Sequence, residues 1–383
     1  MKELKHLIYF ESLLEDTNNE LVRKAESEGD LALGYTCFHA PEVLMNLGNC
    51  FSVRLRAPHT NSMELATYYM ANNSCEFARA LLERALEGNY AFLHAMIGVD
   101  VCEANNRAIE NMEIMHMQGE DKDKFFYCNL DIPYSDDEDC VEHVREQVSR
   151  KILKPLHENY GIDTSDDAIR AAVSEHNEVC RILTEIGELR KLDIPPITGY
   201  GYAVLVLVSY TCPKRLILPY LRETLEEIKS RKTDAEKDYR VRVVVVGSEI
   251  DDPQLIKLTE GCGARVVPAR YCYGSFPGRQ EIILSDTEDA LTQVCRWYLQ
   301  NTECPRQSAM HRVKYRNDHV AQLIKDFNAD GAIYEQMKFC TYWSYERVIA
   351  SQVMPRDYGI HMLSIDRPYI SGQSGQLRTR VQA

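Results

Sequence analysis

Short apolar runs alternate with amphipathic stretches along most of the chain, a pattern typical of a sheet whose strands are joined by helices. In the first half, the apolar runs predict strands at 31–36, 51–55, 94–99 and 124–130. Helices are expected to start near Pro41, Asn73 and Asn105, between these strands. Strict alternation of strand and helix predicts parallel βαβ units with helices on both faces of the sheet.

The second half repeats this architecture without repeating the sequence. The same pattern predicts strands at 241–246, 264–267, 331–336 and 360–365, and helices at 253–260, 286–299, 311–327 and 343–354. We therefore predict an α/β protein of two Rossmann-like, doubly wound parallel-sheet domains.

Two further segments have a helical period. Leucine, isoleucine and valine recur at that period over the first thirty residues, which predicts one amphipathic helix that forms an arm. Apolar residues spaced three or four apart between 139 and 192 predict a helical bridge, which Pro195, Pro196 and Gly199 end. The expected division is an arm at 1–30, a first α/β domain at 31–138, a helical bridge at 139–198 and a second α/β domain at 199–383.

Length and charge narrow the class of protein. A chain of 383 residues favours two domains. Its 44 basic and 58 acidic residues give a net charge of −14, which disfavours nucleic acid and anionic membrane surfaces as partners. The longest mainly apolar run, 203–210, is too short to span a membrane, and the amino terminus is charged, so we expect a cytoplasmic protein.

Thirteen cysteines are the most unusual feature of the composition. A reducing cytosol and an odd count argue against a disulfide framework, and no Cys-x-x-Cys pair exists to build a structural zinc knuckle. Buried thiols, redox chemistry and a metal group remain as explanations.

The position of six cysteines favours a metal group. Cys37, Cys102, Cys272 and Cys340 follow predicted strands, Cys75 opens a predicted helix, and Cys304 lies in a Thr-Glu-Cys-Pro loop. Ligands of open parallel sheets bind beyond the carboxyl ends of the strands, and helix amino termini stabilise thiolates. Each cysteine alone is more often an inert buried thiol, which is how we interpret Cys128, Cys180 and Cys295. Together the six predict an iron–sulfur cluster or zinc, and the absence of closely spaced pairs favours a cluster clamped in the cleft between the domains.

Nucleotide motifs are missing. Gly199-Tyr-Gly201 lacks a preceding strand and a third glycine, and no phosphate loop is present. The chain is therefore not expected to hydrolyse ATP, and any ATP-driven step would need a partner.

At these residues the chain resembles the benzoyl-CoA reductase and 2-hydroxyacyl-CoA dehydratase family. The resemblance covers nearly the whole chain and is carried by 34–44 with Gly48, by Cys75 and Cys102, and by 243–248, 251–253, 263–267, 338–346 and 374–380. It implies an iron–sulfur subunit that receives electrons from a separate ATP-hydrolysing iron–sulfur activator. The implied reaction on an acyl-CoA thioester is 2-hydroxyacyl-CoA dehydration through a ketyl radical, or aromatic acyl-CoA reduction.

The resemblance also implies a ligand set. The positions of Cys75, Cys102 and Cys340 hold a 4Fe-4S cluster in that family, with one iron open to the substrate. An aspartate usually follows the second of these cysteines, and this chain has Glu103 there.

A related branch, the double-cubane cluster proteins, leaves a second interpretation open. Its six-cysteine pattern matches this chain if Cys37, Cys272 and Cys304 join the first three, and it implies an 8Fe-9S cluster that reduces small molecules. The dehydratases pair two unlike subunits, whereas the double-cubane proteins resemble homodimers, so a homologous second subunit and a second copy both remain possible partners. A non-catalytic electron-carrying subunit is a third interpretation.

Other residues are weaker candidates. Ser344, Tyr345 and Glu346 follow Cys340 and could orient the ligands, although a helix cap explains them as well. Arg378 and Arg380 could bind a phosphate or face the negative charge of a cluster, with surface salt bridges as the alternative.

Overall fold

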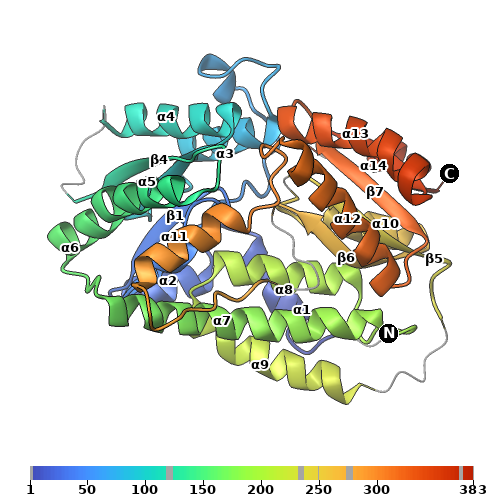
Figure 1. Ribbon diagram of the computed structural model, residues 1–383, viewed down its shortest axis with the longest axis horizontal. Coiled ribbons are helices and arrows are strands. Elements are labelled where there is room, and N and C mark those ends of the chain that lie inside the picture. The colour runs from blue at the N-terminus through green and yellow to red at the C-terminus, as the bar shows by residue number, and fades with distance from the viewer. Residues whose placement is uncertain are drawn as a thin grey trace.

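Two four-stranded parallel sheets, each flanked by helices, form the framework of the protein (Figure 1). The structure is a computed structural model that describes residues 3–117, 124–231, 237–248, 250–272, 279–370 and 374–382. The predicted α/β class with two parallel sheets is confirmed.

The first sheet has the strand order β2-β1-β3-β4. Its strands are β1 (Leu31–Tyr35), β2 (Cys50–Arg54), β3 (Ala95–Asp100) and β4 (Phe126–Asp131). The connecting elements are the 3₁₀ turns η1 (Glu42–Met45) and η2 (Ala66–Tyr68) and the helices α3 (Glu76–Leu86) and α4 (Glu103–Met117). The helix expected near Pro41 is thus only a short 3₁₀ turn.

The second sheet has the order β6-β5-β7-β8. Its strands are β5 (Val241–Gly247), β6 (Ala264–Tyr271), β7 (Gly331–Met337) and β8 (Met362–Arg367). Its helices are α10 (Gln254–Gly261), α12 (Met310–Asp326), α13 (Thr341–Tyr358) and α14 (Ser374–Gln382). β6 runs four residues beyond the predicted strand, which brings Cys272 directly to its carboxyl end.

The remaining helices form a layer alongside both sheets (Figure 1). They are α1 (Leu7–Leu14), α2 (Glu20–Ser27), α5 (Glu138–Val148), the π-helical turn η3 (Ser149–Leu153), α6 (Lys154–Tyr160), α7 (Asp166–Glu188), the turn η4 (Leu189–Lys191), α8 (Gly199–Thr211), α9 (Lys214–Ser230) and α11 (Ala290–Gln300). The helical period over 139–192 is thus confirmed.

The amino-terminal arm corrects the prediction of one amphipathic helix. The chain forms two helices instead, because Asn19 adopts an extended backbone and its side chain accepts hydrogen bonds from the amides of Leu21 and Val22. An asparagine in this role starts a new helix and so ends the earlier one before it.

Helix α8 connects the two sheets. Twelve of its thirteen residues are buried, as expected of a helix that is apolar on every side. It contacts β2 of the first sheet and β6 of the second. Among the described helices, none is long and apolar enough to cross a membrane.

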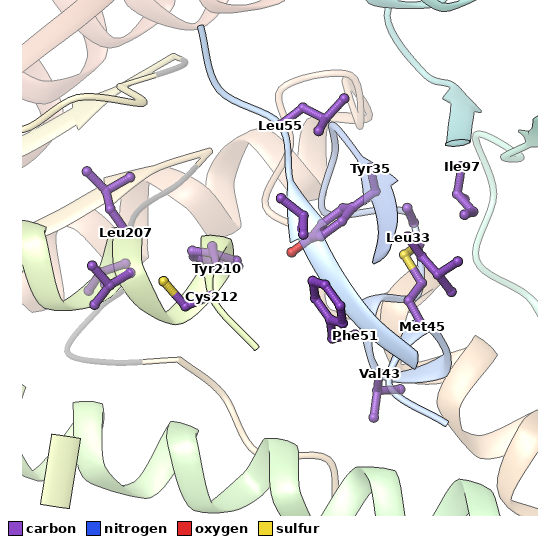
Figure 2. Close-up of a cluster of buried hydrophobic side chains, with 14 of the residues drawn as sticks. Leu33, Tyr35, Val43, Met45, Phe51, Leu55, Ile97, Leu207, Tyr210 and Cys212 are labelled. Carbon is purple, nitrogen blue, oxygen red and sulfur yellow. The ribbon is translucent and has the colours of Figure 1, made fainter. Parts of the chain in front are cut away.

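One hydrophobic core runs through both halves of the chain. Figure 2 shows part of it, where Tyr35 of β1 points toward Tyr210 of α8 and Leu33 lies toward Ile97 of β3. Helix α11, which follows β6 in the chain, packs against α5 and α7. The proposed domain limits stay a prediction, because packing of this kind crosses them.

Candidate cysteine-rich active site

The predicted cysteines lie at the carboxyl edges of the two sheets. Strand order reverses between β1 and β3 in the first sheet, and Cys37 and Cys102 each follow one of these strands by two residues. In the second sheet, Cys340 follows β7 and Cys272 follows β6. Loops at such reversal points diverge and leave a crevice, which is where parallel sheets bind ligands.

Three thiols from the two sheets interact with one another. Cys75 and Cys340 are joined by a side-chain hydrogen bond, which is the largest cause of a Cys340 pKa well above its usual value. Burial and the nearby Cys75 and Cys102 add to that rise. Burial, followed by Cys75, raises the pKa of Cys102 to about 12. The structure therefore brings Cys75, Cys102 and Cys340 together from distant parts of the sequence.

Each of these cysteines stands at the start of a helix. Cys75 is the N-cap residue of α3, Cys340 is that of α13, and Cys102 directly precedes α4. Backbone amides of Ala104 and Asn105 donate to the Cys102 thiol. Amides at helix amino termini favour a thiolate, which is the form of cysteine that binds metal.

The residue before Cys340 has an uncommon backbone. Phe339 has a φ of 65°, in the left-handed region that side chains other than glycine rarely adopt. Next to it, the Glu76 amide donates to the Lys338 carbonyl at 3.2 Å, which ties the start of α3 to the loop before Cys340. The strained turn and this contact together hold Cys75 and Cys340 next to each other.

The other three predicted cysteines share a cavity of about 120 Å³. Cys37, Cys272 and Cys304 all line it. Cys304 also belongs to the surroundings that raise the pKa of Cys102, so the two sets of three cysteines are neighbours. All six residues singled out in the sequence thus gather in one region of the fold.

The donor chemistry of this region suits an iron–sulfur cluster. The raised pKa values mean that the three neighbouring thiols are costly to ionise, and a positively charged metal group bound to the sulfurs would offset that cost. Within the described ranges, no group of three or more His, Cys, Asp or Glu side chains is arranged to hold a single metal ion. Cysteine sulfurs are nevertheless the donors that gather here, and soft thiolates are the ligands that iron–sulfur clusters select.

Buried ion pairs support the loop that carries Cys304. The carboxylate of Glu303 binds Arg270 and also His319, the latter at 2.6 Å. Burial alone would raise the pKa of Glu303, but Arg270 and His319 outweigh it and lower the pKa to about 2. Arg316 donates to the backbone carbonyl of Gln307 at 2.7 Å in the same loop.

The candidates after Cys340 have different positions. Glu346 is buried and forms a two-pronged ion pair with Arg316, with both N–O distances 2.8 Å. Ser344 donates to the carbonyl of Thr341, and the Tyr345 side chain is 64% exposed. Glu346 therefore reaches the Cys304 loop through Arg316, and a role for the other two stays a prediction.

Arg378 and Arg380 lie outside the cysteine cavity. Together with Lys257 they line a second, more open pocket of about 730 Å³ between α10, α14 and the end of β8. Arg380 also donates to the carbonyl of Ser364 at 2.6 Å. The lining also includes Asp252 and Asp366, and a role for Arg378 and Arg380 in binding a phosphate stays a prediction.

The sequence analysis missed the charged residues of the cavity. Glu42, Arg54 and Arg279 line it, and each is buried. The available signal was a charge inside an apolar run, as at Arg54 within 51–55, where an unpaired charge would be costly.

Comparison with known proteins gives a family and several distant relatives. The sequence model described as "2-hydroxyglutaryl-CoA dehydratase, D-component" matches residues 37–383. The (R)-phenyllactyl-CoA dehydratase beta subunit of Clostridium sporogenes is 22% identical over 379 residues, which cover 98% of this chain and 96% of that protein.

Two other relatives are similarly distant. A protein of Escherichia coli (strain K12) named as a dehydratase subunit, YjiM, is 20% identical over 372 residues, which cover 94% of this chain and 92% of that protein. A subunit of the benzoyl-CoA reductase of Thauera aromatica is 20% identical over 272 residues, which cover 70% of this chain and 67% of that protein.

Proposed function

Because the chain belongs to the 2-hydroxyglutaryl-CoA dehydratase D-component family, we propose that it is the iron–sulfur subunit of an ATP-activated dehydratase or reductase that acts on acyl-CoA thioesters. It is a subunit of the 2-hydroxyacyl-CoA dehydratase and benzoyl-CoA reductase type. The observation that carries the finer proposal is the meeting of Cys75, Cys102 and Cys340 at the carboxyl edges of two sheets.

In this proposal Cys75, Cys102 and Cys340 hold a 4Fe-4S cluster. A bound cluster of this kind supplies a low-potential electron and an iron atom that is open to the substrate. The chain itself holds the three sulfurs at helix amino termini, where backbone amides stabilise their negative charge. Cys75 is buried, whereas Cys102 and Cys340 are partly exposed.

The basic pocket supports an acyl-CoA substrate. Its volume of about 730 Å³ lies in the range of pockets that bind cofactor-sized molecules. Lys257, Arg378 and Arg380 are the groups that would bind its phosphates. The pocket adjoins the cysteine region through Tyr369, which lines it and whose amide donates to the Glu76 carboxylate at 2.7 Å, one residue after Cys75.

Two partners complete the proposal. The chain has no phosphate loop, so a separate ATP-hydrolysing iron–sulfur activator would deliver the electron. A homologous second subunit, or a second copy of this chain, is the other partner. The names of the relatives from Clostridium sporogenes and Thauera aromatica support a partner subunit in that they describe each of those proteins as a subunit. Tyr345 and Val348 leave apolar surface exposed on α13, the helix that starts at Cys340, and so offer a place for a partner.

A specific observation favours a second candidate function. Cys37, Cys272 and Cys304 line one cavity, and Cys304 neighbours Cys102, so six sulfurs are available where a 4Fe-4S cluster needs fewer. This arrangement suits an 8Fe-9S double-cubane cluster that reduces small molecules. A purely electron-carrying subunit would use the same cysteines without an open iron.

Iron and acid-labile sulfide per chain, measured after anaerobic purification, test the proposal. About four irons support the 4Fe-4S subunit, and about eight support the double cubane. An anaerobically purified chain that holds no iron, and takes up none on reconstitution, contradicts both. Substrate-induced changes in the electron paramagnetic resonance spectrum distinguish an open iron from a closed electron carrier.

A further inference from the structure

The cysteine cavity has a second wall that contains no sulfur. Six of its residues come from β1, β2, η1, α7, α8 and α11, and the seventh is Arg279. They are Tyr35, Glu42, Arg54, His176, Tyr210, Arg279 and Tyr298. Figure 2 shows the hydroxyl end of Tyr35 facing Tyr210. The guanidinium of Arg54 lies 5.1 Å from the centre of the Tyr210 ring, and that of Arg279 lies 4.0 Å from it.

Besides Nδ1 of His176 and Nη1 of Arg270, two more buried polar atoms of residues that line the cavity have no hydrogen-bond partner among the described residues. They are the hydroxyl oxygen of Tyr35, whose residue is 1% exposed, and Nδ1 of His39, whose residue is 2% exposed. Native proteins satisfy nearly all buried polar groups, because each unsatisfied one costs about 1–3 kcal/mol. Two such atoms on one cavity therefore indicate a polar ligand.

The histidine can act as a donor without being charged. Its Nε2 lies 3.2 Å from the hydroxyl oxygen of Thr302. In the tautomer in which Nε2 accepts from that hydroxyl, Nδ1 carries the hydrogen. Tyr35 and His39 then both offer hydrogens to the cavity, which is the pattern that an acceptor-only ligand requires.

The charge on this wall has the sign that suits an anion. Glu42 accepts a hydrogen bond from Lys214 at 2.5 Å and also binds Arg279. One carboxylate thus faces two cations, all three of which are buried. The surplus positive charge is removed from water, where an anionic partner stabilises it most strongly.

The cavity volume limits the size of the ligand. A volume of about 120 Å³ corresponds to about four water molecules at the density of liquid water. A carboxylate with a short carbon chain fits this space, and a pantetheine arm does not. The ligand is therefore a small molecule, or only the end of a larger one.

We propose that Tyr35 and Arg279 of this wall, together with His39, bind a small carboxylate-class anion beside the cysteines. The proposal deepens the proposed function, on which it rests, by naming the charged group that the substrate presents. Tyr35 and His39 donate hydrogen bonds to the anion, and Arg279 provides the charge. The anion is either a free small molecule or the carboxylate end of an acyl thioester.

Calorimetric titration of the anaerobically purified chain with acetate tests the proposal. We expect one saturable acetate site per chain and no binding of acetamide, which has nearly the same shape without the charge. Tyr35→Phe should weaken acetate binding about tenfold, because a hydrogen bond to a charged group contributes about 1.5–3 kcal/mol. Absence of acetate binding, equal binding of acetamide, or an unchanged affinity in the variant would overturn the proposal.

Tyr90→Phe is the matched control. The Tyr90 hydroxyl is buried away from the cavity and donates to the carbonyl of Arg56 at 2.8 Å. This variant should bind acetate as the unaltered chain does, although it loses a hydrogen bond that stabilises the fold. Tyr35→Phe should show the opposite pair of results, with weaker binding and undiminished stability, because its hydroxyl has no partner within the described residues. A loss of stability in Tyr35→Phe as large as that in Tyr90→Phe would contradict the proposal.

Competition separates the two sources of the anion. Displacement of acetate by glutaryl-CoA but not by pentanoyl-CoA identifies the carboxylate end of a thioester, and displacement by neither identifies a free small anion. Displacement by pentanoyl-CoA would overturn the proposal, because that acyl chain has no charged end. Iron content of the same sample keeps the two proposals apart: acetate binding without iron contradicts the proposed function alone, and iron without acetate binding contradicts the anion site alone.

Discussion

The indole nitrogen of Trp343 donates a hydrogen bond to the sulfur of Cys272 at 3.4 Å. Trp343 lies in the first turn of α13, the helix that begins after Cys340, and Cys272 lies at the end of β6. The contact therefore joins the helix that begins after Cys340, a member of the first cysteine set, to Cys272, a member of the second. It gives a direct way to ask whether Cys272 binds metal.

Trp343→Phe should lower the reduction potential of the bound cluster if Cys272 is a ligand. A hydrogen bond to a ligand sulfur stabilises the more negative, reduced state, so its removal makes reduction harder. A bond of about 1 kcal/mol corresponds to roughly 40 mV for one electron. Potentiometric titration followed by electron paramagnetic resonance measures the shift.

Trp297→Phe provides the control for this shift. Trp297 also lines the cavity, where its ring packs against Phe38 and Tyr298. Its replacement should leave the potential unchanged. Equal potentials in both variants and the unaltered protein would remove Cys272 from the ligand set.

Serine substitution of Cys75, Cys102 or Cys340 should remove iron from the chain. Serine keeps the size of the side chain but is a poor ligand for iron in place of a thiolate. Iron analysis of each variant after anaerobic purification measures the loss. Full retention of iron in all three variants would contradict the cluster assignment.

Cys180→Ser should leave the iron content unchanged. This cysteine is buried inside α7, with its sulfur 3.3 Å from Nε2 of His176.

Iron analysis of Cys37→Ser, Cys272→Ser and Cys304→Ser distinguishes the two cluster types. A double cubane loses iron in all three variants, and a 4Fe-4S cluster in none.

Glu42→Gln should alter the acid branch of the stability curve. Burial alone would raise the pKa of Glu42, but Arg279 and Lys214 lower it far below its usual value. The unfolded chain therefore binds a proton at Glu42 near the ordinary glutamate pKa, whereas the folded chain does not. Ionised Glu42 thus stabilises the fold at pH values above the ordinary glutamate pKa, and this stabilisation is lost as the pH falls below it. Urea titrations between pH 7 and pH 3 should show that slope in the unaltered chain and a weaker one in the variant.

The same variant should be less stable at neutral pH. Removal of the carboxylate leaves Lys214 and Arg279 buried without their shared partner, which costs about 3–5 kcal/mol. An unfolding free energy at pH 7 within 1 kcal/mol of the unaltered chain would show that the buried triad contributes little.

His176→Gln should reduce the pH dependence of stability just below neutrality. Burial, and then the charge of Arg279, lowers the pKa of His176 to about 3. In the unfolded chain His176 binds a proton near pH 6.5, whereas in the folded chain it stays neutral at that pH. The free energy of unfolding therefore decreases as the pH drops through 6.5. Between pH 7.5 and pH 5 the difference amounts to about 2 kcal/mol, which urea titration of chain and variant at both pH values measures.

Local pattern predicted the strands well, because most are dense apolar runs; β1, β2, β3 and β7 are buried on both faces, whereas β4 and β8 are only partly buried. The same method could not find the partners of Glu42, since Lys214 is 172 positions away. It also counted Asn19 as part of a helix that this residue in fact starts anew. Hydrophobic periodicity predicts which face of a helix or strand is buried. It does not predict which residue from a distant part of the sequence contacts that face.

The cysteines show both sides of this limit. Their positions after strands were readable, because the carboxyl edge of a parallel sheet is a general binding place. That Cys75 and Cys340 come within hydrogen-bond reach depends on how the two sheets face each other across α8, which no local pattern encodes. The resemblance to a known family supplied the three-cysteine set that the residues alone left open.

The contact between Cys75 and Cys340 has a consequence for how the protein is made. The two thiols leave the ribosome far apart in time, and neither sheet can assemble the site alone. The polypeptide must therefore be fully synthesised, and its two halves must pack together, before the site that would receive the proposed cluster exists. The proposed cluster would stabilise only the closed chain, so metal supply would also determine how long each new copy survives the cell's proteases.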